Sequence, residues 1–179
     1  MDKATKKQLW TLFILTGEDW RDRNISKKEA SRIIGELLKE KKEEEMKVVR
    51  AIREGIKEGK KRYKQTKEPA MVIYDADLEG RPVKGGNVYY EPEFSGCGTA
   101  WVEWSPGNRK FNNLMKRIAK KYKNLGLTVT KDYYGNWVMF VEGYGYSNGH
   151  IKRTIAFYDA IADKLSELGY NVRVNYRLD

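Results

Sequence analysis

The sequence has almost no cysteine or histidine, the residues from which disulfide frameworks and most zinc centres are built. Among 179 residues it has one cysteine, Cys97, and one histidine, His150. A single cysteine excludes an intrachain disulfide and a cysteine-rich zinc site, and a single histidine excludes motifs that pair two histidines on one metal. We therefore expect no bound metal or other cofactor.

Long apolar runs are also missing. Runs such as WVMFV are too short to cross a bilayer, and the N-terminal stretch MDKATKKQLW lacks the apolar region of a signal peptide. We expect a cytoplasmic protein without a membrane partner. Its 34% charged and 12% aromatic residues are typical of a highly charged chain that still buries a core. The abundance of Lys and Glu resembles that of heat-adapted proteins.

The charge balance points to the kind of partner. Lys and Arg number 35 against 25 Asp and Glu, which gives a formal net charge of +10. A positive protein attracts polyanions over long range and gains free energy when it releases their counterions. Nucleic acid is therefore the first partner to consider, although net charge says nothing about chemistry.

The N-terminal third reads as helical. Residues 1–38 contain two capping boxes, Thr5 with Gln8 and Ser26 with Glu29, each followed by an apolar stripe. We predict a helical hairpin over 1–38. A charged linker helix over 39–68 continues from it, weakened at Gly59 and ended by Pro69.

The pattern changes over residues 69–179. The short apolar run AMVIYDA is followed by a loop rich in Gly and Pro, and then by a strand, GTAWVEWS, and a basic helix. Two strands, LTVTKDYYG and NWVMFVEGY, a helix and a last strand, NVRVNYRL, complete the chain. This order predicts an α+β fold, a ferredoxin-like βαββαβ sandwich with a four-stranded antiparallel sheet.

Two stretches resemble known groups of proteins. ATKKQLWTLFILTG followed by ISKKEASRIIGELL resembles a short helical module of phage and mobile-element proteins, often ones that handle DNA. CGTAWVEWSPGNRKF, GYGYSNGHIKRTIAFYDAIADKLSELGYNV and the terminal YRLD are similar to phage-type proteins with a Cys-Gly-x-Ala-Trp-Val run. These resemblances imply an origin in a phage or mobile element and imply no activity.

The basic helix is the strongest candidate site. KFNNLMKRIAKKYKNLG carries six Lys or Arg and no acid, and its apolar stripe turns these cations toward solvent. Like charges at i and i+4 each cost a few tenths of a kcal/mol, roughly, unless something anionic neutralises them. We predict phosphate contacts from Arg109, Lys110, Lys116, Arg117, Lys120, Lys121 and Lys123.

The free face of the sheet is the second candidate. Alternation places Arg173 and Arg177 of the last strand outward, on the same side as Trp101. We predict that Trp101 and Trp137 stack on unpaired bases of single-stranded DNA or RNA. Glu103 on that face counts against such a platform. The strand NWVMFVE is apolar on both sides, so residues 1–68 or a second copy packed sheet to sheet would cover this face equally well.

Two other functions compete with nucleic-acid binding. A protein-binding modulator, such as an inhibitor of a host factor, would use the same basic helix or apolar sheet face. A small nuclease would hold Mg²⁺ between Asp75 and Asp77, with Glu91 and Glu93 nearby. Cys97 beside His150 could form a nucleophilic pair, but a glycine-flanked turn explains that cysteine more simply. We favour a non-enzymatic nucleic-acid-binding accessory protein, with no catalytic or metal-binding residue assigned.

Overall fold

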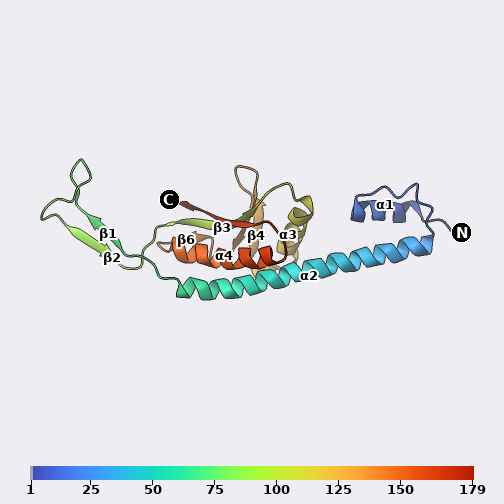
Figure 1. The fold of residues 1–179 in the computed structure, drawn as a ribbon, viewed down its shortest axis with the longest axis horizontal. Helices are drawn as coiled ribbons and strands as arrows, with labels where there is room; N and C mark the ends of the chain where they lie inside the picture. Colours follow the sequence, from blue (N-terminus) through green and yellow to red (C-terminus); the bar gives the residue numbers. More distant parts are fainter. Residues whose placement is uncertain (1) are drawn as a thin grey trace. The chain divides into compact units, whose positions relative to one another are not determined.

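The computed structural model describes residues 2–179 and has an α+β fold with four α-helices among those residues. Its strands form antiparallel sheets. The chain divides into two compact units, Met1–Lys47 and Val48–Asp179. Figure 1 colours the elements along the sequence.

The first unit contains helix α1 (Lys6–Thr16) and the start of helix α2 (Lys27–Gln65). The capping box predicted at Thr5 is confirmed: Thr5 Oγ1 accepts a hydrogen bond from Gln8 N, and Gln8 Oε1 accepts one from Thr5 N. Gly17 then ends α1 in the left-handed conformation, with φ 78°. At the start of α2, Ser26 Oγ accepts from Glu29 N at 3.1 Å.

Gln8 also connects the two helix starts. Its Nε2 donates to the carbonyl oxygen of Lys27 at 2.9 Å and to Ser31 Oγ at 2.8 Å. Helix α2 is continuous over 39 residues and has no break at residue 38, where the sequence suggested that a linker begins.

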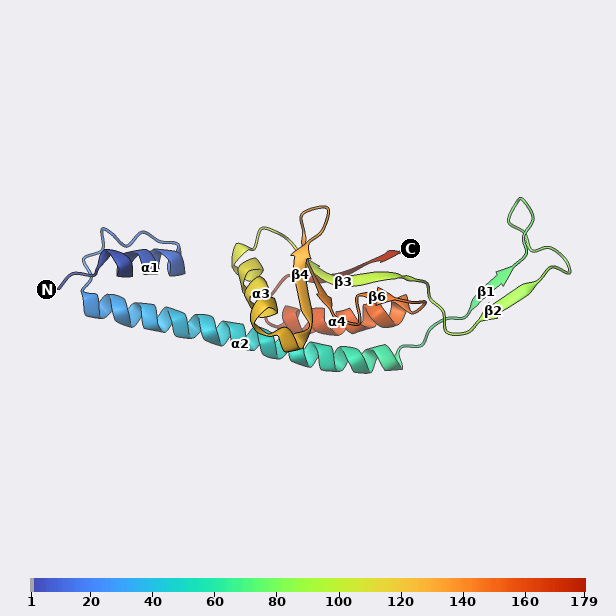
Figure 2. The same cartoon turned by 180° about the vertical axis from the view of Figure 1, so that it is seen from behind.

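The second unit is built on a five-stranded antiparallel sheet in which β4 pairs with β5, β5 with β3, and β3 with β7. These strands are β3 (Gly98–Trp104), β4 (Leu127–Lys131), β5 (Trp137–Val141) and β7 (Arg173–Leu178). The two-residue β6 (Tyr146–Ser147) pairs with the start of β3 and was not predicted. Helices α3 (Arg109–Lys121) and α4 (Ile151–Glu167) follow β3 and β6 in the chain, as Figures 1 and 2 show.

One face of this sheet forms the core of the unit. Ala100, Val102 and Trp104 alternate along β3 and are all buried in one cluster with residues of α2, α3 and α4. The helices contribute, among others, Ile52, Phe111, Met115, Ile118, Phe157, Tyr158 and Ile161. The Tyr158 hydroxyl accepts a hydrogen bond from Val141 N at 3.0 Å, and burial raises the pKa of Tyr158 to about 12.

Helix α2 packs on α4 through two glycines spaced four residues apart. A Cβ added at Gly55 would lie 2.7 Å from Ile161 Cα, and one added at Gly59 would lie 2.6 Å from the carbonyl oxygen of Phe157. The absence of side chains therefore allows the two backbones to approach each other. Gly59, which the sequence suggested as a weak point of the helix, is a packing residue within it. This half of α2 belongs to the core of the second unit, and the units divide after Lys47.

Strands β1 (Met71–Tyr74) and β2 (Val88–Glu91) form a separate antiparallel hairpin. The sequence indicated an apolar run at β1 and a loop where β2 lies. We call residues 69–93 the arm. Figures 1 and 2 show the arm extending away from the sheet of its own unit.

No helix within residues 2–179 has the length and apolarity needed to cross a membrane.

The glycine contact predicts a position-dependent effect within a single helix. Gly59→Ala should lower the free energy of unfolding by about 1–3 kcal/mol, because the new methyl group meets the α4 backbone. Gly35→Ala, where nothing lies within 4 Å, should raise it by about 0.5–1 kcal/mol because alanine favours a helix. Chemical denaturation of both variants tests this, and equal effects would contradict the packing described.

Candidate nucleic-acid interface

The orientation of α3 is set by side chains at its N-terminus. Asn108 caps the helix by accepting a hydrogen bond from Phe111 N at 3.0 Å. Asn112 is buried, accepts from Trp104 Nε1 at 2.8 Å and donates to the carbonyl oxygen of Pro106 at 2.9 Å. These bonds fix which side of the helix faces the core. The sequence predicts a buried stripe of Phe111, Leu114, Met115, Ile118 and Tyr122. The first four are buried, and Tyr122 is half-buried.

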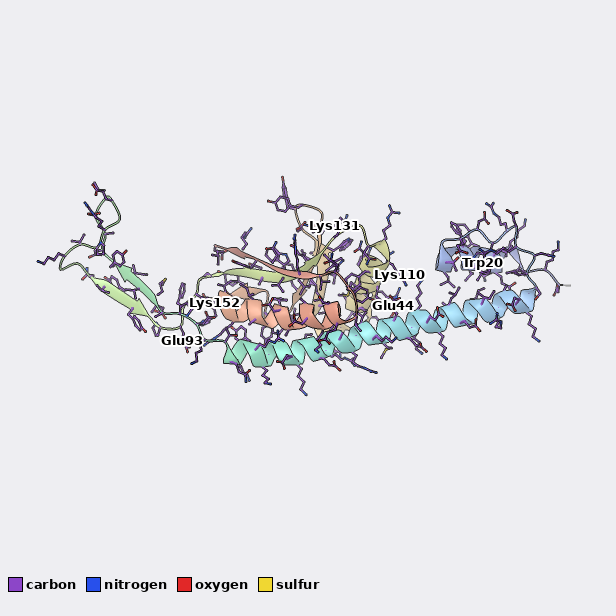
Figure 3. All side chains as sticks on the ribbon, viewed as in Figure 1. Trp20, Glu44, Glu93, Lys110, Lys131 and Lys152 are labelled. Carbon is purple, nitrogen blue, oxygen red and sulfur yellow. The ribbon has the colours of Figure 1, made fainter. Side chains whose placement is uncertain are left out.

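The cations of α3 therefore lie outside the core, in two stripes. Arg109, Lys116 and Lys120 follow the spacing i, i+7 and i+11, directly opposite the buried residues. A second stripe with the same spacing lies further around the helix and consists of Lys110, Arg117 and Lys121. All six side chains are exposed. Figure 3 labels Lys110 at the start of the helix.

Trp137 does not share a face with Trp101, so the platform predicted from these two residues is wrong. The register pairs Trp137 with Trp104, whose side chain is in the core, and this places Trp137 on the helix side of the sheet. There its ring is approached by two cations. Lys116 Nζ lies 5.0 Å from the ring centroid and Lys131 Nζ lies 5.5 Å from it, both within cation–π range.

A groove follows the C-terminal end of α3. The short 3₁₀ helix η1 (Lys123–Leu125) and the end of β5 line it on one side, and α2 lines it on the other. Its volume is about 470 Å³. Arg53, Lys60 and Lys123 come together here, and Glu142 is the acid among the residues that line the groove. The groove thus brings two cations of α2 together with Lys123, two residues after the end of α3.

Arg53 and Lys60 were not among the binding residues predicted from the sequence, although their spacing pointed to a basic stripe on α2. Basic residues recur on α2 at positions 53, 57, 60 and 64, a spacing that puts them on one side of a helix. We define the cationic band as three sets of exposed cations: those that line this groove, the α3 stripe opposite the buried residues, and the two lysines beside the Trp137 ring. Its members are Arg53, Lys60, Arg109, Lys116, Lys120, Lys123 and Lys131.

The face of the sheet opposite the core presents a different aromatic pair. Trp101 and Phe140 lie there, with ring centroids 6.0 Å apart. The β3–β7 register also confirms that Arg173, Asn175 and Arg177 lie on this face. The side chains of Arg173 and Arg177 are 75% and 76% exposed, so their guanidinium groups are accessible.

Glu103 forms hydrogen bonds with three other side chains of this face. Its carboxylate is buried and accepts hydrogen bonds from Trp101 Nε1 at 3.1 Å, Asn175 Nδ2 at 3.0 Å and Arg173 Nε at 2.6 Å. Burial alone would raise the pKa of Glu103, but the hydrogen bonds from Asn175, Arg173 and Trp101 outweigh it and hold the pKa below the ordinary 4.5. The carboxylate positions an aromatic ring and a cation.

The acids of the arm shape its loop. Asp75 Oδ2 accepts hydrogen bonds from Asn87 N and Nδ2, at 2.8 and 3.1 Å. The backbone N–H and guanidinium of Arg81 bind Asp77 and lower its pKa. Glu93 pairs with Arg153. Across residues 2–179, no group of three or more His, Cys, Asp or Glu side chains could hold a metal ion.

The first backbone N–H groups of α4 donate hydrogen bonds to other residues of the chain. Ile151 N donates to Gly96 O, Lys152 N to Ser95 Oγ and Arg153 N to Glu68 Oε1. His150 Nδ1 is buried and has no hydrogen-bond partner among the described residues.

Comparison of the chain with protein-family models, with curated proteins and with solved structures finds no match. The function of the two surfaces must therefore be inferred from their own geometry and charge.

The Glu103 network predicts a pH-dependent stability. Because the folded-state pKa of Glu103 lies below 4.5, its stabilisation is complete above that pH and is lost as the pH falls through the folded-state value. Glu103→Gln should lower the free energy of unfolding by about 1–3 kcal/mol at about pH 7. The difference from the wild type should shrink as the pH approaches about 3.

Urea denaturation at several pH values measures this difference. Glu142→Gln, at an exposed glutamate, is the matched control and should leave the pH profile unchanged. A constant difference between Glu103→Gln and the wild type at every pH would show that the carboxylate charge is not what stabilises the network.

Proposed function

We propose that this chain binds nucleic acid, with the phosphates lying along the cationic band. The observation that carries this proposal is the groove where Arg53 and Lys60 of α2 meet Lys123. Two cations of α2 converge there with one from a segment far along the chain. Within the described chain none of the three forms an ion pair, whereas Arg62 of the same helix pairs with Asp163 at 2.7 Å.

Phosphates suit this arrangement for an electrostatic reason. Exposed cations held close together repel one another, and an anion that bridges them removes that repulsion. A nucleic-acid backbone supplies such anions at regular intervals and gains further free energy by releasing its own counterions. The extension of the band along α3 suits a chain of phosphates better than a single anion.

We propose that the sheet face around Trp101 and Phe140 contacts unpaired bases. Both rings lie on the face that carries Arg173 and Arg177, and a base stacked on an aromatic ring contributes about 1–3 kcal/mol. Stacking needs bases that are not paired, so single-stranded DNA or RNA is the expected ligand.

We also propose that β3 to β7 form a ferredoxin-like sandwich. The pairing of β4 with β5, of β5 with β3 and of β3 with β7 supports it, as do the connections through α3 and α4. The hydrogen bonds of Gln8 support a helical hairpin made by α1 and the start of α2. A cytoplasmic location and an origin in a phage or mobile element stay predictions from the sequence.

The proposal predicts a loss of affinity when the band is neutralised. A variant with Lys116, Lys120 and Lys123 each replaced by Gln should bind single-stranded oligonucleotides about tenfold more weakly, or worse, near physiological salt. The dependence of log K on log salt should become shallower by about 2, because each lost phosphate contact on a single strand removes about 0.7 from the slope. Fluorescence anisotropy with labelled single-stranded and double-stranded DNA and RNA measures both quantities.

The matched control replaces Lys39, Lys42 and Lys47 of α2 with Gln. These lysines are exposed and lie in the first unit, so the control loses the same charge outside the band. Its affinity should stay near that of the wild type. Equal weakening of both variants would mean that net charge alone attracts the ligand. No binding at low salt would overturn the proposal and favour a protein partner with an acidic surface.

A further inference from the structure

The arm exposes apolar side chains on both of its faces. Val72, Ile73, Val88 and Tyr90 are 53%, 51%, 67% and 66% exposed. The register places Val72 and Tyr90 on one face and Ile73 and Tyr89 on the other. No other strand within the described residues pairs with either β1 or β2. A two-stranded hairpin is at best marginally stable alone in water, so contacts with another surface would stabilise this one.

The base of the arm is held firmly, so its direction is set. Phe94 N donates to the carbonyl oxygen of Pro69 at 2.7 Å and closes the two ends of the arm. Arg153 of α4 donates to Thr66 O and pairs with Glu93. Figure 3 shows Glu93 at this base, near the start of α4 where Lys152 is labelled. The base of the hairpin is therefore anchored to α4 and to the end of α2.

The charge of the arm is opposite to that of the rest of the chain. Residues 69–93 carry five carboxylates and two cations, a net charge of −3. The other residues therefore carry a net charge of +13, which together with the arm gives the total of +10. An acidic, apolar hairpin attached to a strongly basic protein is complementary to the body of another copy.

Strand β7 offers a matching surface. It lies at the edge of the sheet, and its outer side pairs with no strand of the described chain. Tyr176 and Leu178 are 50% and 55% exposed. Arg173 and Arg177 are the cations of this edge; Arg173 pairs with the buried Glu103, and Arg177 lies 4.0 Å from Asp179 and is 76% exposed. An unpaired edge of this kind is a template for strand addition.

We propose that the arm of one copy pairs with the β7 edge of a second copy, in a reciprocal exchange that closes a two-fold dimer. Strand pairing satisfies the open edges of both elements, the exposed apolar side chains cover one another, and the acidic arm meets the arginines. Pairing of two arms would instead bring −3 against −3. This dimer goes beyond nucleic-acid binding and does not depend on it.

A charge-reversal pair tests the contact by sedimentation velocity across a range of protein concentrations. The wild-type chain should form a dimer that weakens as salt is added. Glu91→Lys and Arg177→Glu should each weaken it about tenfold or more, because each alone puts like charges in contact. An equimolar mixture of the two variants should restore a dimer, since both contacts between unlike variants again join opposite charges. Glu40→Lys, an exposed residue outside the arm, is the matched control and should dimerise normally.

Two further results decide the proposal. Replacing Ile73 and Tyr90 with Thr removes apolar surface from both faces of the arm and should also favour the monomer. Circular dichroism checks that each variant is folded. A wild-type monomer at the highest soluble concentration, or a dimer unaffected by both charge reversals, would overturn the proposal. Failure of the mixture to restore the dimer would show that the arm and the β7 edge do not meet.

Discussion

The backbone contact between α2 and α4 is the constraint on which the second unit depends. Gly55 and Gly59 allow α2 to lie against α4, and this approach sets where the other side chains of α2 can reach. Arg53 and Lys60 then line a groove with Lys123, which follows α3 in the chain. The nucleic-acid surface that we propose is thus a consequence of helix packing as well as of the sequence of α3.

The sheet separates two chemically different surfaces. On the core side, Lys116 and Lys131 of the cationic band lie within cation–π range of the Trp137 ring. On the other side, Glu103 draws Trp101 and Arg173 together and leaves the guanidinium group largely exposed. A buried carboxylate of this kind costs solvation free energy, and several charged or polar donors are needed to offset that cost. The same bonds restrict the positions that the aromatic and basic side chains can take.

Local signals in the sequence predicted much of this arrangement. The cap at Thr5, the apolar stripe of α3 and the alternation in β7 each depend on residues close together in the chain, and all three are confirmed. The side of the sheet on which Trp137 lies was not predictable in this way. Strand β5 is apolar on both sides, so alternation does not choose between them, and the register with β3 decides.

The remaining differences also arise from contacts between distant segments. From the sequence alone Gly59 is a weak point of the helix, and only the α4 backbone that it faces shows its packing role. The pairing of β2 with β1 across a long loop has no short-turn signature, so β2 reads as part of a loop. The groove at Lys123 could not be anticipated from α3 alone, although the basic stripe on α2 was visible in the sequence.

Lysine reactivity in the presence of nucleic acid tests the central claim most directly. The protein would be acetylated briefly with and without a saturating single-stranded oligonucleotide, and modification at each lysine measured by mass spectrometry. The account predicts protection of Lys60, Lys116, Lys120 and Lys123, with Lys39, Lys42 and Lys47 unchanged. Protection spread evenly over all lysines, or confined to those outside the cationic band, would contradict it.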